Sequence, residues 1–306
     1  MTHVDLRPLG STGIQASPIT LGTSYLGANT EPGSAEESAA VDLANALLSG
    51  PYALVDTSNA YAGGRSEAIL GLASGPADVV TKTDRDLSGG VFNADRVVRS
   101  FEESCERLGV EHVRILHLHD PYTITFEEAS APGGAIEGMT KLKERGLVDA
   151  IGIAAGRNST VKSFVFSDAF DVVLTHNRFT LVDQSAVPIL EAAHERGMGV
   201  FNAAPFGGKL LAKGAASLEK YAYQPSPPEL LAWVARVERI CAEHGTDLPT
   251  VALHFSLRSP LVHSTVVGVS SPERLAQLEA TRTATVPAEV WEAIAALGPA
   301  PSPITD

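Results

Sequence analysis

The chain has 306 residues, 44 % of them hydrophobic, which is enough to bury one large core, so we expect a single domain over residues 1–306. The formal net charge of −13 is spread along the chain and argues against nucleic acid and anionic membrane surfaces as partners. The two cysteines, Cys105 and Cys241, fit neither a disulfide framework nor a cysteine-based zinc site. The sequence has no secretory leader pattern and no apolar run long enough to span a bilayer, so we expect a cytoplasmic protein.

Eight short apolar, β-branched segments alternate with segments of helical periodicity, which is the pattern of repeated βα units. The expected strands are residues 19–22, 53–56, 79–83, 115–119, 150–154, 172–175, 200–203 and 264–267. The expected covering helices include residues 34–48, 94–108, 134–145 and 184–196. In these helices apolar residues recur at intervals of three and four, and several end with a basic residue followed by glycine.

Eight βα units form either a closed barrel or an open doubly wound sheet. The open sheet binds dinucleotides through a G-x-G-x-x-G turn after its first strand, and residues 21–27 lack that spacing. We therefore predict a (β/α)₈ TIM barrel. Residues 6–9 and 14–17 flank a Gly-Ser-Thr-Gly turn and predict an N-terminal β-hairpin that closes the lower end of the barrel. A long loop after strand 7, residues 205–228, is predicted to be a binding element.

Polar side chains lie at the ends of three consecutive predicted strands: Asp56, Lys82 and His119. In a parallel barrel the carboxyl ends of the strands meet at one rim, where active sites are built. Tyr61 follows Asp56 by five residues and is within reach of the same rim. Alone, each residue has an ordinary explanation: a turn-capping aspartate, a solvated lysine, a packed histidine and a loop aromatic. Their coincidence at one rim favours a proton-transfer site.

A tyrosine has an ordinary pKa of about 10, too high for acid–base work near neutrality, and an adjacent ammonium would lower that pKa. Lys82 is suited to this role beside Tyr61, and Asp56 is suited to hold the buried ammonium. His119 could donate a hydrogen bond that polarises a carbonyl oxygen. No side chain carries hydride, so a hydride transfer at this site requires a cofactor.

The motifs around these residues resemble the aldo-keto reductase signature. Asp56-Thr-Ser-Asn-Ala-Tyr61 is followed by a Ser-Glu pair, Lys82 lies in Val-Val-Thr-Lys-Thr, and His119 precedes an Asp-Pro pair. The resemblance covers nearly the whole chain. It implies a nicotinamide-dependent oxidoreductase with a catalytic tetrad of Asp56, Tyr61, Lys82 and His119, and it implies no catalytic metal.

The same resemblance implies where the nicotinamide dinucleotide, NADP or NAD, binds. A glycine-bearing loop that begins at Pro205 would let backbone amides approach a phosphate. Ser271 and Arg274 either bind a 2′-phosphate or serve as a helix cap and a solvated side chain. No lysine stands at the Gly268 position, so the choice between NAD and NADP stays open. The implied cofactor contacts are Gly22, Thr23, Ser24, His176, Pro205, Phe206, Gly207, Gly208, Leu210, Gly268, Ser270, Ser271 and Arg274.

Three alanines depart from the family pattern. Ala154 and Ala155 replace a Ser-Asn pair that recognises the carboxamide, and Ala203 replaces an aromatic that stacks on the nicotinamide. His176 takes the place of a glutamine that touches the carboxamide. The sequence leaves open what covers the nicotinamide ring.

Within the family, the segments around His119, Arg178 and Phe206 are most similar to bacterial L-fucose and D-threo-aldose 1-dehydrogenases. This similarity implies oxidation of an aldose at C1 to the lactone, with Tyr61 taking the anomeric hydroxyl proton. Pyridoxal 4-dehydrogenases share much of the pattern, and a general aldehyde or ketone reductase is a further alternative. The expected walls of the pocket for this small sugar or carbonyl substrate are Tyr25, Tyr122 and Phe179.

Two interpretations from other classes stay open. One is a non-catalytic, cofactor-binding regulatory subunit of the same fold. The other is a metal-dependent hydrolase barrel in which His117 and His119 form an H-x-H pair, although this leaves the pairing of Lys82 with Tyr61 unexplained. The oligomeric state is not indicated by the sequence.

Overall fold

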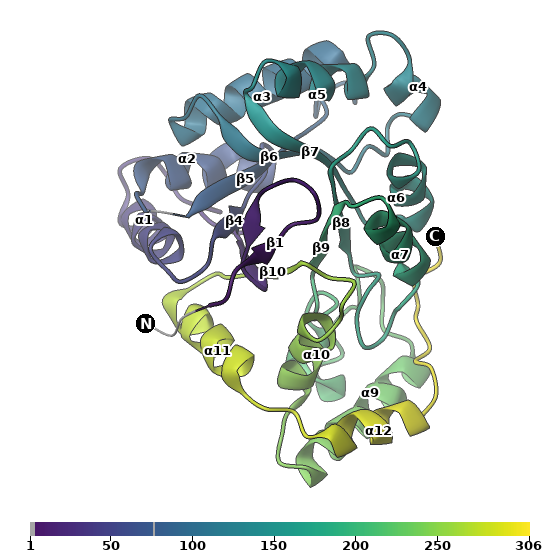
Figure 1. The fold of residues 1–306 in the computed structure, drawn as a ribbon. Helices are drawn as coiled ribbons and strands as arrows, with labels where there is room; N and C mark the ends of the chain where they lie inside the picture. Colours follow the sequence, from purple (N-terminus) through teal and green to yellow (C-terminus); the bar gives the residue numbers. More distant parts are fainter. Residues whose placement is uncertain (1–3, 76) are drawn as a thin grey trace.

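The computed structural model describes residues 4–75 and 77–306 and shows a closed barrel of parallel strands surrounded by helices (Figure 1). The order around the barrel is β10-β3-β4-β5-β6-β7-β8-β9, which confirms the predicted TIM barrel. The eight predicted strands are all present, with ends that differ by one or two residues because pairing with neighbours, not apolar content, sets strand length. Their bounds are β3 (Ile19–Gly22), β4 (Leu54–Asp56), β5 (Asp78–Thr83), β6 (Val113–His119), β7 (Val148–Ala155), β8 (Val172–His176), β9 (Gly199–Ala203) and β10 (Ser264–Gly268).

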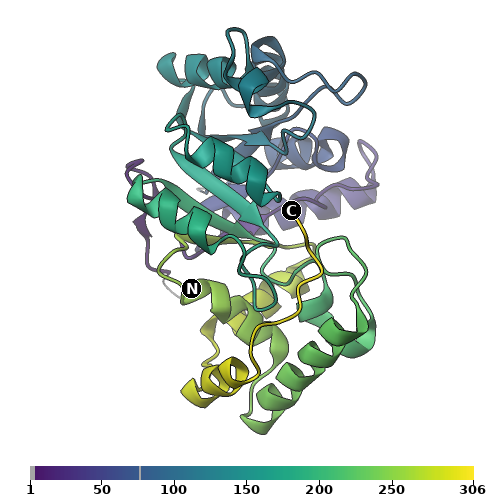
Figure 2. The same cartoon turned by 90° about the vertical axis from the view of Figure 1, so that its right-hand side faces the viewer.

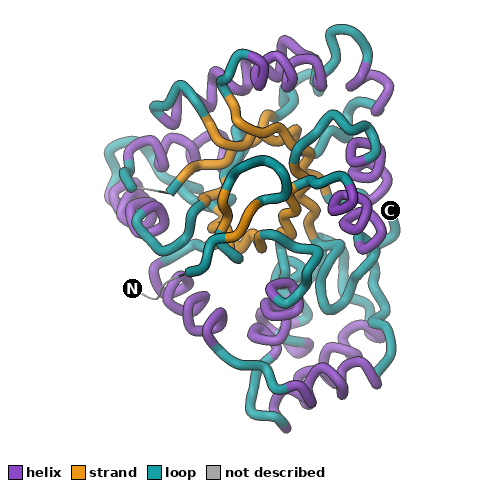
Figure 3. The backbone as a smooth tube through the Cα atoms, viewed as in Figure 1, coloured by secondary structure: helices purple, strands orange, loops and turns teal. Residues whose placement is uncertain are grey.

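Helices cover the outside of the barrel (Figure 3). The side chain of Ser34 accepts a hydrogen bond from the backbone N–H of Glu37 and so fixes the start of α1; Asn93 does the same for α3. None of the helices in the described part of the chain is long and apolar enough to cross a lipid bilayer. The bounds are α1 (Ala35–Leu48), α2 (Arg65–Leu72), α3 (Ala94–Leu108), α4 (Phe126–Ser130), α5 (Ala135–Glu144), α6 (Asn158–Val165), α7 (Val187–Glu195), α8 (Leu210–Lys213), α9 (Pro228–Glu243), α10 (Leu248–Leu257), α11 (Pro272–Thr283) and α12 (Ala288–Ala296).

The predicted hairpin is present as β1 (Arg7–Pro8) and β2 (Gln15–Ala16), and it closes the amino-terminal end of the barrel. Leu9 is fully buried and packs with side chains that fill the barrel, such as Leu54 and Phe201. Gly10 has φ +55, and a Cβ on it would lie 2.4 Å from the carbonyl oxygen of Gly197, so this turn requires glycine. Because the hairpin fills this end, the opposite rim is left for chemistry.

The segment after β9 is more structured than the predicted long loop. Residues 205–228 contain α8 and a 3₁₀ turn, η2 (Ala215–Ser217), and their apolar side chains join α9 and α10 in a second hydrophobic cluster. Tyr221 is fully buried there. Its hydroxyl donates to the carbonyl oxygen of Asn177 at 2.9 Å and lies 2.6 Å from Thr180 Oγ1. The segment is therefore anchored to the barrel.

Gly207, just before α8, has φ +58, and a Cβ on it would lie 2.1 Å from Cε2 of Tyr221. We expect Gly207→Ala to lower the free energy of unfolding by about 1–3 kcal/mol, because the left-handed backbone costs an L-residue about 1–2 kcal/mol and the buried ring must also move. Urea denaturation measures this. Gly33→Ala is the control, since Gly33 has φ +80 but no described atom within 4 Å of its added Cβ. An equal loss in both variants would contradict the packing role of Gly207.

The chain after α12 runs back across the molecule and ends beside α6 (Figure 2). The carboxylate of Asp306 accepts hydrogen bonds from the backbone N–H groups of Asn158 at 2.5 Å and Ser159 at 2.6 Å. A negative side chain at this position complements the positive end of the α6 dipole. The contact joins the last described residue to the carboxyl-terminal side of the barrel.

Candidate active site

Strands β4, β5 and β6 lie side by side in the barrel (Figure 1). They end with Asp56, Lys82 and His119 at the same rim. Lys82 is 1 % exposed, and its ammonium donates to both carboxylate oxygens of Asp56, at 2.7 and 2.8 Å, and to the carbonyl oxygen of Thr57 at 2.7 Å. A buried ammonium needs such partners because it has lost its water. Lys82 is therefore a fixed positive charge and not a solvated side chain.

Tyr61 begins a short 3₁₀ turn, η1 (Tyr61–Gly64), in the loop after β4. Its hydroxyl oxygen lies 3.3 Å from Lys82 Nζ, and the ammonium lies 4.6 Å from the centroid of the tyrosine ring. The ring of His119 stands edge-on to Tyr61, with the two centroids 5.7 Å apart. The fold thus brings all four tetrad candidates together. A phenol beside a fixed cation and an imidazole is an arrangement suited to exchanging a proton with a ligand oxygen.

The pKa of Tyr61 differs from the expectation. Burial raises the pKa of Tyr61, the charge of Lys82 lowers it and the carboxylate of Asp56 raises it again, to a net value of about 12. Burial alone would lower the pKa of Lys82, but the charge of Asp56 and the contacts with Asp56 and Tyr61 together outweigh burial and raise this pKa above its ordinary value. Lys82 therefore lowers the pKa of Tyr61 as predicted, but burial and Asp56 outweigh this effect, and the phenol keeps its proton at neutral pH.

These shifts predict how stability depends on alkaline pH. An unfolded tyrosine loses its proton near pH 10, whereas folded Tyr61 holds its proton up to about pH 12. Protonated Tyr61 therefore contributes to the free energy of unfolding below about pH 10, and this contribution is lost as the pH rises toward about 12. The raised pKa of Lys82 changes the stability in the same direction. We expect the urea midpoint to fall above about pH 10, and to fall less in Tyr61→Phe. Superimposed curves for the two proteins would show that the phenol contributes nothing.

Two polar residues that do not stand out in the sequence contact His119. Asp84 is 5 % exposed, and its Oδ1 lies 2.8 Å from Nδ1 of His119. Ser58 donates from Oγ to Asp84 Oδ2 at 2.5 Å, and this Oγ lies 3.1 Å from Nδ1 of His119. Asp84 follows Lys82 by two positions and Ser58 follows Asp56 by two, and residues two apart along an extended chain share a face. That spacing is the signal that could have identified both.

The other edge of the His119 ring faces a carboxylate. Asp120 Oδ2 lies 4.0 Å from His119 Nε2, and Asp120 Oδ1 lies 3.5 Å from Nε2 of His176. Burial raises the pKa of Asp120, but the hydrogen bond to His176 and the charge of His119 lower it further, to about 2. Asp120 is thus a carboxylate at neutral pH. His176, expected near the carboxamide, lies beside this carboxylate at the rim.

The two histidines of the H-x-H pattern lie in different environments. His117 is fully buried inside the barrel, edge-on to Phe201 with ring centroids 5.9 Å apart, and burial holds its pKa well below the ordinary value. His119 lies at the rim. Over residues 4–75 and 77–306, no group of three or more His, Cys, Asp or Glu side chains is arranged to hold a metal ion. The pattern therefore consists of one packed histidine and one rim histidine.

The predicted cofactor contacts occupy an arc of the same rim. β8, β9, β10 and β3 are consecutive around the barrel, and β3 adjoins β4, so the arc lies beside the tetrad. The exposed members are Ser24, Gly208, Gly268, Ser270 and Arg274, and the buried ones are Gly22, Thr23, Pro205, Gly207 and Leu210. Phe206 and His176 are half-buried. Exposed backbone at glycines together with a guanidinium fits an anionic dinucleotide.

One end of this arc lies at the N-terminus of α11. Ser271 caps α11, because its Oγ accepts a hydrogen bond from the backbone N–H of Arg274 at 3.3 Å. The guanidinium of Arg274 is exposed and donates to Gln277 at 2.7 Å. The cap role of Ser271 is therefore present, and Arg274 stays accessible to an anion at the helix N-terminus.

The three alanines that depart from the family pattern lie at the carboxyl ends of β7 and β9. Ala154 and Ala155 end β7 and are buried, and Ala203 ends β9 half-buried. Their methyl groups offer no hydrogen-bond partner. A carboxamide above them would have to bind backbone groups or the half-buried His176.

The three expected walls of the substrate pocket have different positions. Tyr25 is 74 % exposed beside the rim. Tyr122 accepts hydrogen bonds at its hydroxyl from the backbone N–H groups of Gly156 at 2.8 Å and Arg157 at 3.3 Å. Phe179 is 5 % exposed and packs in the core against Phe255, with ring centroids 5.1 Å apart. The prediction for Phe179 is therefore wrong: its ring packs the core, because a hydrophobic neighbour on α10 covers it.

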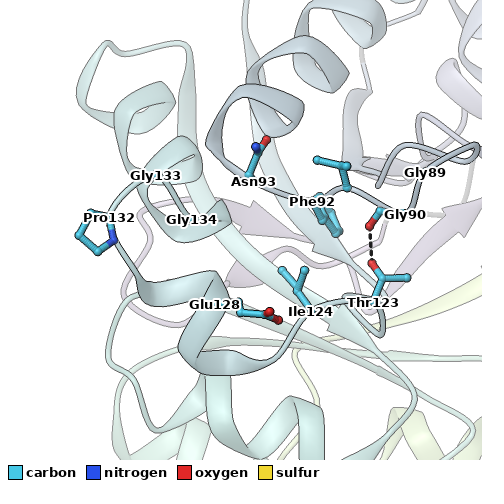
Figure 4. Close-up of a pocket in the computed structure, with 11 residues that line it drawn as sticks. Gly89, Gly90, Phe92, Asn93, Thr123, Ile124, Glu128, Pro132, Gly133 and Gly134 are labelled. Carbon is cyan, nitrogen blue, oxygen red and sulfur yellow. Dashed lines mark hydrogen bonds between the residues drawn. The ribbon is translucent and has the colours of Figure 1, made fainter.

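An open cavity of about 340 Å³ lies outside the tetrad, between residues 89–93 and α4 (Figure 4). Thr123 donates to the carbonyl oxygen of Gly90 at 2.8 Å and so joins the loops that follow β5 and β6. Glu128, the carboxylate in the lining, is engaged in the capping box of α4. None of the tetrad residues lines this cavity, so we assign the chemistry to the barrel rim.

Comparisons with known proteins identify the family of this chain. The aldo/keto reductase family profile matches residues 18–299. A D-threo-aldose 1-dehydrogenase from Pseudomonas sp. is 33 % identical over 69 % of this chain and 64 % of its own length, slightly less than two thirds of that relative. An L-galactose dehydrogenase from Arabidopsis thaliana is 31 % identical over 89 % of this chain and 86 % of its own. A pyridoxal 4-dehydrogenase from Microbacterium luteolum is 28 % identical over 95 % and 97 %.

Among solved structures, an aldo-keto reductase from Bacillus halodurans in its holo form superimposes with a TM-score of 0.74 at 20 % identity, covering 96 % of each chain. This likeness shows the shared barrel fold. The family profile covers most of the sequence, including all four tetrad candidates. The chain therefore belongs to the aldo/keto reductase family of NAD(P)H-dependent oxidoreductases.

Proposed function

We propose that this protein oxidises an aldose at C1 to the lactone, with NAD or NADP as hydride acceptor and Tyr61 as the proton-transfer residue. The observation that carries the proposal is the position of the Tyr61 hydroxyl oxygen, 3.3 Å from Lys82 Nζ and beside His119, on the rim that adjoins the arc of cofactor candidates. The relatives named as D-threo-aldose and L-galactose dehydrogenases support an aldose substrate.

The residues of the tetrad have different roles in the proposed reaction. Asp56 and the carbonyl of Thr57 hold the Lys82 ammonium, so that its charge is fixed beside the phenol oxygen and stabilises negative charge that develops there. Oxidation requires a base, so Tyr61 acts in its ionised form, which the charge of Lys82 stabilises, and accepts the proton of the anomeric hydroxyl. The nicotinamide, when bound along the arc from β8 to β3, supplies the hydride chemistry.

The charges at the rim favour a hydroxylated substrate over a simple aldehyde. Asp120 is ionised and half-buried next to His119, and its Oδ1 has only a long contact of 3.5 Å to Nε2 of His176. A carboxylate in this state needs donors. A sugar offers several hydroxyl groups, whereas an unsubstituted aldehyde offers none.

Oxidation of pyridoxal at its hemiacetal carbon is a second candidate. The relative named as a pyridoxal 4-dehydrogenase matches this chain over 95 % of its length, more than the aldose 1-dehydrogenase does. Pyridoxal forms a cyclic hemiacetal, so its oxidation removes a hydride from a carbon that bears a hydroxyl group, as in an aldose. The same Tyr61 and Lys82 arrangement would serve both reactions.

One assay separates these candidates. Purified protein is mixed with NAD or NADP separately, and formation of reduced nicotinamide is followed by absorbance with L-fucose, D-arabinose, L-galactose and pyridoxal. Reduction of NAD or NADP by an aldose is expected. Turnover of pyridoxal alone would favour the second candidate, and consumption of NADPH with simple aldehydes alone would identify a carbonyl reductase. Cofactor binding without any turnover would favour a regulatory subunit.

A further inference from the structure

Asp120 follows His119 directly, at the point where β6 ends. Its backbone is left-handed, with φ +41, a conformation that is strained for a residue other than glycine and that is concentrated at functional sites. Two backbone hydrogen bonds fix it: the N–H of Asp120 donates to the carbonyl oxygen of Ala154 at 2.9 Å, and the carbonyl oxygen of Asp120 accepts from the N–H of Tyr122 at 2.6 Å. The backbone therefore sets the position of Asp120 beside His119.

His176 contacts one oxygen of the Asp120 carboxylate. Nε2 of His176 lies 3.5 Å from Asp120 Oδ1, and Nδ1 of His176 lies 3.0 Å from the amide nitrogen of Asn177. The amide NH₂ only donates, so Nδ1 accepts and the proton of a neutral His176 is on Nε2, facing the carboxylate. The ring lies against Gly156, where an added Cβ would be 2.3 Å from Cε1 of His176. Oδ1 of Asp120 thus faces a donor that is held in place.

Tyr122 donates a second hydrogen bond to this carboxylate. The hydroxyl oxygen of Tyr122 accepts from the backbone N–H groups of Gly156 at 2.8 Å and Arg157 at 3.3 Å, so its own proton is left for Asp120. Burial raises the pKa of Asp120, but the hydrogen bonds from His176 and Tyr122 are among the contacts that lower this pKa to about 2. Asp120 is therefore an ionised acceptor with a defined orientation.

The carboxylate of Asp120 has acceptor positions that the protein does not use. Its side chain is 29 % exposed, and no lysine or arginine in the described ranges 4–75 and 77–306 forms an ion pair with it. A carboxylate offers about four acceptor positions, of which His176 and Tyr122 take two at most. Oδ2 lies 4.0 Å from Nε2 of His119, whereas Nδ1 of His119 is occupied by Asp84 at 2.8 Å. An accessible acceptor therefore lies beside the free edge of His119.

We propose that Asp120 is a substrate-binding residue that recognises the hydroxyl group on C2, the carbon next to the reacting C1 of the sugar. Its Oδ2 accepts the proton of that hydroxyl, while the C1 oxygen lies at Tyr61 and His119. Gauche oxygens on neighbouring sugar carbons lie about one hydrogen-bond length apart, so a C1 oxygen at Nε2 of His119 places the C2 oxygen within reach of an acceptor 4.0 Å from Nε2.

The proton count of this arrangement is consistent with the reaction. The C1 hydroxyl gives its single proton to Tyr61, and the C2 hydroxyl, which does not react, gives its own proton to Asp120. The proposal rests on the proposed oxidation of an aldose and specifies which group of the sugar is recognised. It predicts discrimination against a substrate that lacks only this hydroxyl.

The carboxamide of the nicotinamide is the competing partner for Asp120, because its NH₂ group also donates. The position of Asp120 favours the substrate. Asp120 belongs to the segment after β6, next to His119, whereas the predicted cofactor contacts lie at the ends of β3, β8, β9 and β10 and in the segments that follow them. A carboxamide contact would change NAD(P)H affinity, whereas a C2 hydroxyl contact changes selectivity between substrates.

The test compares substrates that differ by one hydroxyl group next to the reacting carbon. D-arabinose and 2-deoxy-D-ribose form the pair for oxidation, and lactaldehyde and propanal form the pair for reduction. In the parent protein we expect kcat/KM to be about 10- to 100-fold higher for the hydroxylated member of each pair, the usual effect of a hydrogen bond to a charged group. A ratio near one in the parent protein would overturn the proposal without any variant.

Asp120→Asn tests the cause. His176 keeps the amide oxygen at the Oδ1 position, so the NH₂ group takes the Oδ2 position and cannot accept. The ratio is expected to fall about 10-fold or more, with unchanged NAD(P)H affinity. Asp168→Asn is the matched control, since Asp168 also has a left-handed backbone, φ +56, but lies between α6 and β8 and pairs with Arg196; its ratio should equal that of the parent.

Two results for Asp120→Asn would contradict the proposal: a ratio equal to that of the parent, or a loss of NAD(P)H affinity with an unchanged ratio. The two substrate pairs separate this failure from failure of the proposed function. If aldehydes are reduced but no sugar is oxidised, the proposed function fails, and the lactaldehyde to propanal ratio still decides the role of Asp120. If both sugars are oxidised equally well, the function stands and the role of Asp120 fails. Absence of all turnover would overturn both.

Discussion

Replacing Lys82 by methionine is expected to lower the free energy of unfolding by about 3–5 kcal/mol and to abolish turnover, because the variant leaves the buried carboxylate of Asp56 without its cation. Lys82 makes three hydrogen bonds of 2.7–2.8 Å to Asp56 and Thr57, and none of these oxygens gains a new donor from methionine. Urea denaturation measures the stability, and the aldose assay measures the activity.

Two further variants separate the ion pair from general effects of the substitution. Lys141 lies on the exposed surface of α5, so Lys141→Met is expected to change stability little. The double variant Lys82→Met/Asp56→Leu removes both charges and is expected to recover part of the stability but none of the activity. A double variant as unstable as the sum of the two single variants would show that the two charges do not act as a pair.

Tyr61→Phe is expected to reduce kcat by about 10²- to 10⁴-fold and to leave cofactor binding and folding largely intact. The substitution removes the hydroxyl that lies 3.3 Å from Lys82 Nζ, while the ammonium keeps its contacts to Asp56 and Thr57. Steady-state kinetics with the best substrate and titration of NAD(P)H by fluorescence measure the two effects. Near-normal turnover in this variant would assign proton transfer to another residue.

Tyr52→Phe is the matched control for this substitution. Tyr52 is also buried, but it precedes β4 at the opposite end of the barrel, where its hydroxyl donates to Glu279. The expected pattern is the reverse of that for Tyr61→Phe, namely reduced stability with normal kcat, because the substitution removes a hydrogen bond to the half-buried carboxylate of Glu279, far from the rim. Loss of kcat in both variants would point to a general effect of removing a buried hydroxyl.

The fold could be predicted in detail because it depends on local patterns. The β-branched runs and helical periodicity located the eight strands, and Ser34 and Asn93 act as the helix caps expected of such residues. The order of strands along the chain fixes which ends meet in a barrel of βα units. This is why Asp56, Lys82 and His119 could be placed at one rim before any coordinates were considered.

Two features that the sequence did not predict depend on contacts between segments that are distant in the chain. The burial of Phe179 follows from Phe255, which lies on α10, 76 residues later (255 − 179). The order in residues 205–228 follows from Tyr221, whose hydroxyl reaches back to the segment after β8. No sequence spacing predicts either contact, because these segments meet only when the barrel closes.

The sequence by itself determined the barrel, the rim that carries the chemistry and the four residues at its centre, since each of these follows from the period of the apolar pattern and the order of the strands. Only the tertiary structure decided their protonation. The pKa of Tyr61 rises to about 12 because burial and the Asp56 charge outweigh Lys82, and the carboxylate of Asp84, just after the adjacent strand β5, lies 2.8 Å from Nδ1 of His119. Charge interactions depend on distance and on excluded water, and both are properties of the packed rim rather than of the chain.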